Sequence, residues 1–127
     1  GFHLFPVLEI DATTSAGQGV YNTLAKSYLP GEAEAPLYLC PAGIPEKLEH
    51  TLKRMATAAF EAINGLDVGR VDFRMGPDAQ PYLMEINTLP GLNPVVSDLC
   101  IMAQAEGIPY PDLIADILDL ARERYGI

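Results

Sequence analysis

The sequence is poor in cysteine and has no long apolar run. Cys40 and Cys100 are the only two cysteines in 127 residues. Two thiols are too few for the disulfide framework of a small secreted domain, so we expect free thiols in a reducing compartment. No apolar run reaches the 18 or more residues of a membrane-spanning helix, and the first residues lack the basic and apolar regions of a signal peptide. These absences predict a cytoplasmic protein with no membrane partner.

Basic residues are also scarce. Lys and Arg together number 8 against 17 Asp and Glu, which gives a formal net charge of −9. Nucleic acids and anionic membranes bind faces rich in Lys and Arg, so neither is an expected partner. An anionic substrate would need a metal ion to supply positive charge at its binding site.

The remaining composition is that of an ordinary globular domain. With 127 residues, 49% of them apolar, the chain is predicted to form a single domain, residues 1–127. Apolar spacing and Pro or Gly boundaries predict strands at 4–10 and 37–40, a helix at 45–64, a hairpin at 70–87, and helices at 95–107 and 111–125. This order indicates an α+β fold in which helices pack on one face of an antiparallel sheet.

The first predicted helix has the clearest pattern. Pro45 suits its first turn and Gly65 its carboxyl-terminal stop. His50 falls off the apolar stripe, so we expect a solvated side chain rather than a ligand. The apolar residues that define the stripe are Leu48, Leu52, Met55, Ala59, Phe60 and Ile63.

The hairpin brings polar side chains together. Gly76-Pro77-Asp78-Ala79 supplies turn residues. A reversal centred between Asp78 and Ala79 would pair Asp72 with Glu85 and Arg70 with Asn87 on one face. Directly opposed side chains lie about 4.5–5.5 Å apart, so two acids there need a compensating cation or water. Two carboxylates and an amide are oxygen ligands of the kind Mg²⁺ takes together with substrate phosphates. The alternative is a solvated acidic face.

Two segments of this hairpin carry a family resemblance. Arg70-Val-Asp-Phe and Tyr82-Leu-Met-Glu-Ile-Asn-Thr-Leu-Pro-Gly91 resemble the C-terminal signature of D-alanine–D-alanine ligases, of the ATP-grasp superfamily. The resemblance extends to 21–28, 40–42, 105–113 and the last helix. It implies the C-terminal ATP-grasp subdomain of a ligase whose N-terminal domain and first ATP-grasp half have no counterpart here, and it implies that the isolated chain is inactive.

The resemblance also implies a reaction and its cofactors. Such ligases phosphorylate a carboxylate with ATP, and an amine then attacks the acyl phosphate, here in peptidoglycan precursor synthesis with D-alanine as the suspected substrate. The implied cofactors are ATP and two Mg²⁺ ions, with Mn²⁺ as a substitute. A homodimer is one state that the resemblance allows for the full-length protein.

Residue roles follow from the matching positions. Glu85 resembles the ligand that bridges two ions and also contacts the nucleotide, while Asp72 and Asn87 each resemble the ligand of one ion. Arg70 would stabilise negative charge in the reaction, although an ion pair with Asp72 or Glu85 is the structural alternative. The backbone N–H of Gly91 resembles an oxyanion donor.

Further implied contacts lie outside this metal set. Lys26 would reach the terminal phosphate of ATP from a closing loop, or else be an ordinary surface lysine. Met84 would pack against adenine, or else belong to the core. Tyr21 and Ser97 are the implied substrate contacts.

Two departures leave the substrate open. Ser27 stands where the family usually has Tyr, and ungapped counting puts Val96 at the place of a substrate-binding Ser, with Ser97 one position later. A shift of one residue rotates a helical side chain by about 100°. A ligase for a different amino acid or amine, and a non-catalytic acidic binding module on the same scaffold, are therefore the alternatives.

Overall fold

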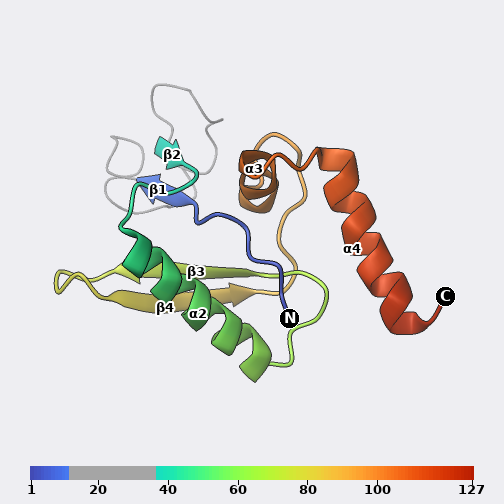
Figure 1. The fold of residues 1–127 in the computed structure, drawn as a ribbon, viewed down its shortest axis with the longest axis horizontal. Helices are drawn as coiled ribbons and strands as arrows, with labels where there is room; N and C mark the ends of the chain where they lie inside the picture. The colour runs from blue at the N-terminus through green and yellow to red at the C-terminus, as the bar shows by residue number, and fades with distance from the viewer. Residues whose placement is uncertain (12–36) are drawn as a thin grey trace.

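The computed structural model describes residues 1–11 and 37–127. Their elements are, in chain order, β1 (Glu9–Asp11), β2 (Leu37–Leu39), α2 (Glu46–Ala62), β3 (Arg70–Met75), β4 (Pro81–Asn87), α3 (Asp98–Ala105) and α4 (Tyr110–Tyr125). Strands β1 and β2 form one antiparallel pair, and β3 and β4 form another. Helix α2 crosses the β3–β4 hairpin, while α3 and α4 pack against each other beyond the end of that hairpin (Figure 1). The α+β prediction is confirmed, with two small sheets in this part of the chain.

The predicted strand at 4–10 is largely wrong. Strand β1 is only three residues long and pairs with β2 through Glu9↔Leu39, Ile10↔Tyr38 and Asp11↔Leu37. The preceding residues run past α3 instead, and Phe5 packs against the apolar cluster between α3 and α4. Packing of the half-buried Phe5 ring, together with a hydrogen bond from the N–H of Ala42 to the carbonyl of Val7 at 2.8 Å, therefore holds this segment.

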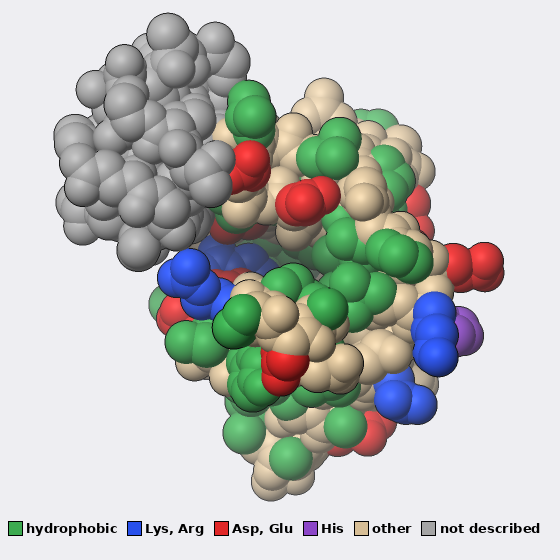
Figure 2. Space-filling view, turned by 90° about the vertical axis from the view of Figure 1, so that its left-hand side faces the viewer, with side chains coloured by type: hydrophobic (Ala, Val, Ile, Leu, Met, Phe, Trp, Pro, Cys, Tyr) green, Lys and Arg blue, Asp and Glu red, His purple; other side chains and the backbone are tan. Residues whose placement is uncertain are grey.

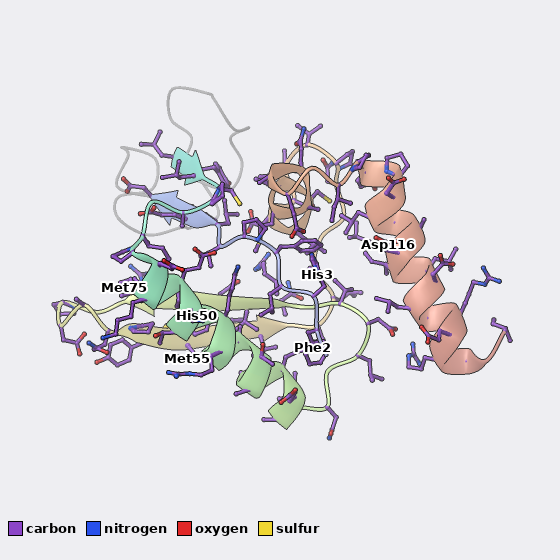
Figure 3. All side chains as sticks on the ribbon, viewed as in Figure 1. Phe2, His3, His50, Met55, Met75 and Asp116 are labelled. Carbon is purple, nitrogen blue, oxygen red and sulfur yellow. The ribbon has the colours of Figure 1, made fainter. Side chains whose placement is uncertain are left out.

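The amino-terminal residues also reach α2 and α3. The ring of Phe2 meets the ring of Phe60 edge-on, with 5.2 Å between the centroids, and Nε2 of His3 lies 2.7 Å from a carboxylate oxygen of Glu106. Figure 3 shows Phe2 beside the later turns of α2, and His50 on an earlier turn of the same helix. The side chain of His50 is exposed, as predicted.

Phe60 anchors α2 against the chain that follows it. Leu52 and Phe60 are the buried side chains of this helix, each with 7% of its surface exposed. A Cβ atom at Gly65 or at Gly69 would lie 2.4 Å from the Phe60 ring. Glycine is thus required at both positions because the backbone approaches the ring so closely.

The end of α2 differs from the expected one. The helix ends at Ala62, and Asn64, with φ of 55°, takes the left-handed conformation that often follows a helix. Gly65 contributes a backbone N–H that donates to the carbonyl of Phe60 at 2.9 Å. Gly65 therefore serves the packing of Phe60, and Asn64 provides the turn.

Helices α3 and α4 enclose a small apolar cluster. Cys100, Ala103 and Leu113 are buried in it, and Phe5, Ile108 and Ile117 pack around them. The helix predicted at 95–107 starts too early, because α3 begins at Asp98 and Val95 precedes it with 63% of its surface exposed. Both cysteines are free thiols, as expected. Among the helices of the described segments, none is long and apolar enough to cross a membrane.

Candidate functional site

The β3–β4 hairpin brings the predicted ligands together. Its register pairs Arg70 with Asn87 and Asp72 with Glu85. Strand alternation places these four side chains on one face of the hairpin. The predicted pairing of the four residues is confirmed.

The centre of the predicted reversal is wrong by half a residue, which shifts the pairs next to the turn by one residue. The N–H of Gly76 donates to the carbonyl of Gln80 at 2.8 Å, and the N–H of Ala79 donates to the carbonyl of Gly76 at 3.0 Å. The turn therefore centres on Asp78, and Ala79 adopts φ of 59°. Towards the tip Phe73 pairs with Leu83, whereas Asp72 pairs with Glu85, so Met84 is an unpaired bulge residue. The bulge compensates for the shifted turn and restores the expected pairs.

Arg70 supplies the cation that the opposed acids need. Its Nε and Nη2 atoms donate to the two carboxylate oxygens of Asp72 at 2.7 and 2.8 Å. Its Nη1 atom lies 3.4 Å from Oδ2 of Asp98, the first residue of α3. The hydrogen bonds to Asp72 raise the pKa of Arg70, opposed by burial and assisted by attraction to Asp72, Asp98 and Glu85. Arg70 is therefore held as a fixed positive charge between two elements.

The other two oxygen donors differ in their surroundings. Glu85 is exposed. Oδ1 of Asn87 accepts the backbone N–H of Leu89 at 2.9 Å, which orients the amide at the end of β4. No cluster of three or more acidic, His or Cys side chains able to hold a metal is found within residues 1–11 and 37–127. Asp72, Glu85 and Asn87 thus provide two acids and one amide, and further ligands would have to come from elsewhere.

A tight turn places Ser97 against Gly91. Oδ1 of Asn93 accepts the N–H groups of Val95 and Val96 at 2.8 and 3.2 Å, and the N–H of Asn93 donates to Oγ of Ser97 at 2.7 Å. An ideal Cβ at Gly91 would lie 2.8 Å from the same Oγ atom. The hydroxyl of Ser97 is therefore fixed beside the backbone of residue 91.

One groove collects the predicted site residues. Figure 2 shows the surface hollowed between the lobe that carries β1 and β2 and the lobe that carries the hairpin, with charged side chains inside the hollow. The groove has a volume of about 1570 Å³. Its lining includes each predicted site residue of the described segments, namely Arg70, Asp72, Met84, Glu85, Asn87, Gly91 and Ser97.

Two predicted site residues, and the Ser that replaces the family's usual Tyr, cannot be placed in this groove. Tyr21, Lys26 and Ser27 lie outside the described residues. Met84 is 60% exposed, so the alternative that it is a core residue is wrong. Asp98 was not predicted as a site residue, because no spacing in the sequence connects it to the hairpin. Asn93 was not predicted either, although its Asn-Pro dipeptide does signal a turn.

The fold and this site define an α+β protein whose antiparallel hairpin presents oxygen donors and an arginine to a groove. The family model described as D-ala D-ala ligase C-terminus matches residues 3–119. The chain therefore belongs to the family of the carboxyl-terminal part of D-alanine–D-alanine ligases.

Individual relatives agree with this family. The chain is 35% identical over 122 residues to a D-alanine–D-alanine ligase of Pelotomaculum thermopropionicum. This alignment covers 96% of the chain and 36% of the relative. It is 41% identical over 92 residues to the ligase of Nitrosococcus oceani, covering 72% of the chain and 29% of the relative. The chain thus spans about a third of the length of these curated relatives.

A solved structure supports the same fold. The D-alanine–D-alanine ligase of Bacillus anthracis, solved in complex with ATP, superposes with a TM-score of 0.62 at 31% identity. The match covers 69% of the chain and 31% of the ligase.

Proposed function

We propose that these residues are the metal- and nucleotide-binding carboxyl-terminal part of an ATP-dependent carboxylate–amine ligase of the D-alanine–D-alanine type. The observation that carries the proposal is the register that pairs Asp72 with Glu85 and Arg70 with Asn87 at one groove. The family supports the reaction, in which ATP phosphorylates a carboxylate and an amine displaces the phosphate from the acyl phosphate.

The donor set fits two Mg²⁺ ions, with Mn²⁺ as a substitute. Hard cations bound near phosphates usually take one or two carboxylates, with phosphate and water oxygens completing the shell. Glu85 would hold both ions, with Asp72 on one and Asn87 on the other. When bound, the ions would neutralise phosphate charge during phosphoryl transfer.

Arg70 and Gly91 would act on the reacting acyl group. Arg70 carries a guanidinium that, like any arginine, stays charged at physiological pH, and the hydrogen bonds to Asp72 raise its pKa further. Such a group stabilises negative charge that develops on an acyl phosphate or a tetrahedral oxygen. The N–H of Gly91 would donate to that oxygen, and the absence of a side chain lets substrate approach the backbone closely.

The remaining roles concern nucleotide and substrate. The exposed thioether of Met84 at the groove is suited to pack against adenine, and Lys26 would contact the terminal phosphate. Tyr21 and Ser97 would contact the amino-acid substrate. Ser97 is favoured over Val96 because its hydroxyl, and not the neighbouring side chain, lies beside Gly91.

Conditions for this activity are met in the cytoplasm, where ATP is available and the free thiols of Cys40 and Cys100 would persist. For the whole protein we propose a homodimer, on the family resemblance alone. Sedimentation of the longest natural polypeptide that contains these residues would test the assembly.

Phosphate release with a panel of amino acids tests the function. The longest natural polypeptide containing these residues should release phosphate from ATP with Mg²⁺ and D-alanine, and D-alanyl-D-alanine should accumulate. Release with another amino acid, and none with D-alanine, would instead favour the ligase for a different amine. No release with any member of the panel would contradict both and favour a binding module.

A further inference from the structure

The ion pair between Arg70 and Asp98 links the two halves of the site. Arg70 belongs to β3 with the proposed metal ligand Asp72, whereas Asp98 begins α3 directly after Ser97. The side chain of Asp98 is only 11% exposed. The first turn of a helix favours a carboxylate, because the helix dipole is positive there.

Arg70 and a metal ion would compete for the negative charge of Asp72. Both carboxylate oxygens of Asp72 accept hydrogen bonds from Arg70. Each oxygen keeps a second lone pair, so an ion can bind Asp72 beside Arg70, but repulsion between the two cations would then favour opening of those hydrogen bonds. The guanidinium would then lose its strongest partner at a place where only 23% of its side chain is exposed, and uncompensated charge is costly there.

Asp98 provides the partner that remains. We propose that Asp98 is a positioning residue that retains Arg70 when a divalent ion takes Asp72, so that Asp72 is released to the ion and Arg70 stays at the site. This inference rests on the proposed function, since it takes Asp72 as a metal ligand. The 3.4 Å separation of Nη1 and Oδ2 can shorten once the bonds to Asp72 have opened.

A pair of substitutions separates this role from a direct effect of charge. The negative charge of Asp98 could attract an ion by itself, without Arg70. The test is Mn²⁺ binding, followed by electron paramagnetic resonance in the longest natural polypeptide that contains these residues. Four proteins would be compared, namely the wild type, Asp98→Asn, Arg70→Ala and the double variant. Asp98→Asn should weaken Mn²⁺ binding about tenfold when Arg70 is present, the size typical of groups that orient metal ligands. It should have less than about a twofold effect in the Arg70→Ala background, as two residues that act as a unit require.

Matched variants control for the fold. Asp112 is an exposed acid in the first turn of α4, so Asp112→Asn should leave Mn²⁺ binding and thermal unfolding unchanged. Asp98→Glu keeps the charge and should restore most of the affinity. Equal weakening by Asp98→Asn in both backgrounds, or no weakening in either, would overturn the proposal while leaving the metal assignment intact.

Two further outcomes are distinguishable. Absence of Mn²⁺ binding in the wild type and in Arg70→Ala would overturn the metal assignment of the proposed function, and this inference with it. If Asp98→Asn does not fold, NMR of the Arg70 guanidinium in the unsubstituted protein decides instead. Saturating Mg²⁺ should release Nε–H from its hydrogen bond, while the protons on Nη1 stay protected from exchange with solvent by Asp98. Loss of protection at both nitrogens would overturn the proposal.

Discussion

Gly91 and Ser97 are in such close approach that no side chain fits between them. An ideal Cβ at Gly91 lies 2.8 Å from Oγ of Ser97 but 3.6 Å from its Cβ. Gly91→Ala should therefore displace the Ser97 hydroxyl and lower kcat/KM by up to about 100-fold, the cost of misplacing a substrate contact by an ångström. Steady-state phosphate release in the longest natural polypeptide containing these residues measures the effect.

The matched control removes the hydroxyl first. In a Ser97→Ala background the new methyl group meets only the Cβ of residue 97, at an ordinary contact distance. Gly91→Ala should then lower kcat/KM by a smaller factor than in the wild type, and the remaining loss measures how far the methyl group hinders the approach of substrate to the backbone. If the loss is as large in that background as in the wild type, the methyl group acts on the substrate or on the N–H of residue 91 rather than through Ser97.

The metal assignment predicts a specific effect of Glu85→Gln. Glu85 is exposed, so the amide should leave thermal unfolding unchanged. Loss of the ligand proposed for both ions should lower phosphate release at least about 100-fold. Glu61→Gln, an exposed acid on α2, is the control and should keep full activity. Unchanged kinetics for Glu85→Gln would contradict the role of this residue.

The 127-residue chain by itself should not turn over ATP. It spans 36% of one ligase relative and 31% of the ligase solved with ATP, so most of such a protein is outside these residues. Phosphate release with Mg²⁺ and D-alanine should stay at the rate of the buffer blank. Turnover by the purified chain above that rate would show that these residues contain a complete site.

Phe60 should carry much of the stability of α2. Phe60→Ala empties the space between the helix and the backbone of Gly65 and Gly69, and should lower the free energy of unfolding by about 3–5 kcal/mol. Gly69→Ala forces a methyl group against the ring and should cost about 1–3 kcal/mol. Urea unfolding followed by circular dichroism measures both, and Glu61→Ala on the same helix should change little. Similar losses for Glu61→Ala and Phe60→Ala would contradict the packing argument.

The surface ion pair between Asp67 and Arg124 should make the stability of the protein depend on pH. Nε and Nη2 of Arg124 on α4 donate to the carboxylate of Asp67 at 3.2 and 2.7 Å, and this lowers the pKa of Asp67. The stabilisation from this ion pair is complete above the pKa of Asp67 in the unfolded chain, about 3.9. It is lost as the pH falls through the lower pKa that Asp67 has in the folded protein. Asp67→Asn tolerates the φ of 59° at this position. The variant should lower the thermal midpoint by no more than about 3 °C at pH 7.

The pH series supplies the control for that variant. The difference in midpoint between wild type and Asp67→Asn should stay constant down to about pH 4 and close below it. A difference that persists at pH 2 would mean that the amide acts through the backbone of the loop and not through the charge of Asp67.

Local sequence patterns were sufficient to predict the elements nearest the site. Alternation and turn residues predicted the β3–β4 hairpin, and helical spacing predicted α2, because each depends on residues close together in the chain. The pairs Arg70–Asn87 and Asp72–Glu85 followed from the length of the hairpin. Their prediction was correct only because a shifted turn and an unpredicted bulge offset each other.

Long-range contacts could not be predicted from the sequence. The pairing of Arg70 with Asp98 depends on where α3 begins in space, which periodicity does not encode. The local sequence before β1 predicts a strand, yet Phe5 packs against the α3–α4 cluster. Ungapped counting along the chain puts Val96 at the place of the substrate-binding Ser, but the Asn93 turn holds the hydroxyl of Ser97 beside Gly91.

The bulge at Met84 separates the two ends of the hairpin from one another. On one side of it Asp72 faces Glu85, and on the other Phe73 faces Leu83. Deleting Met84 would join these two ladders into one regular ladder without moving any pair to a new partner. Protein engineers can therefore shorten the hairpin by one residue here while keeping the acids and the arginine in place, and the groove would lose an exposed thioether but none of its charged groups.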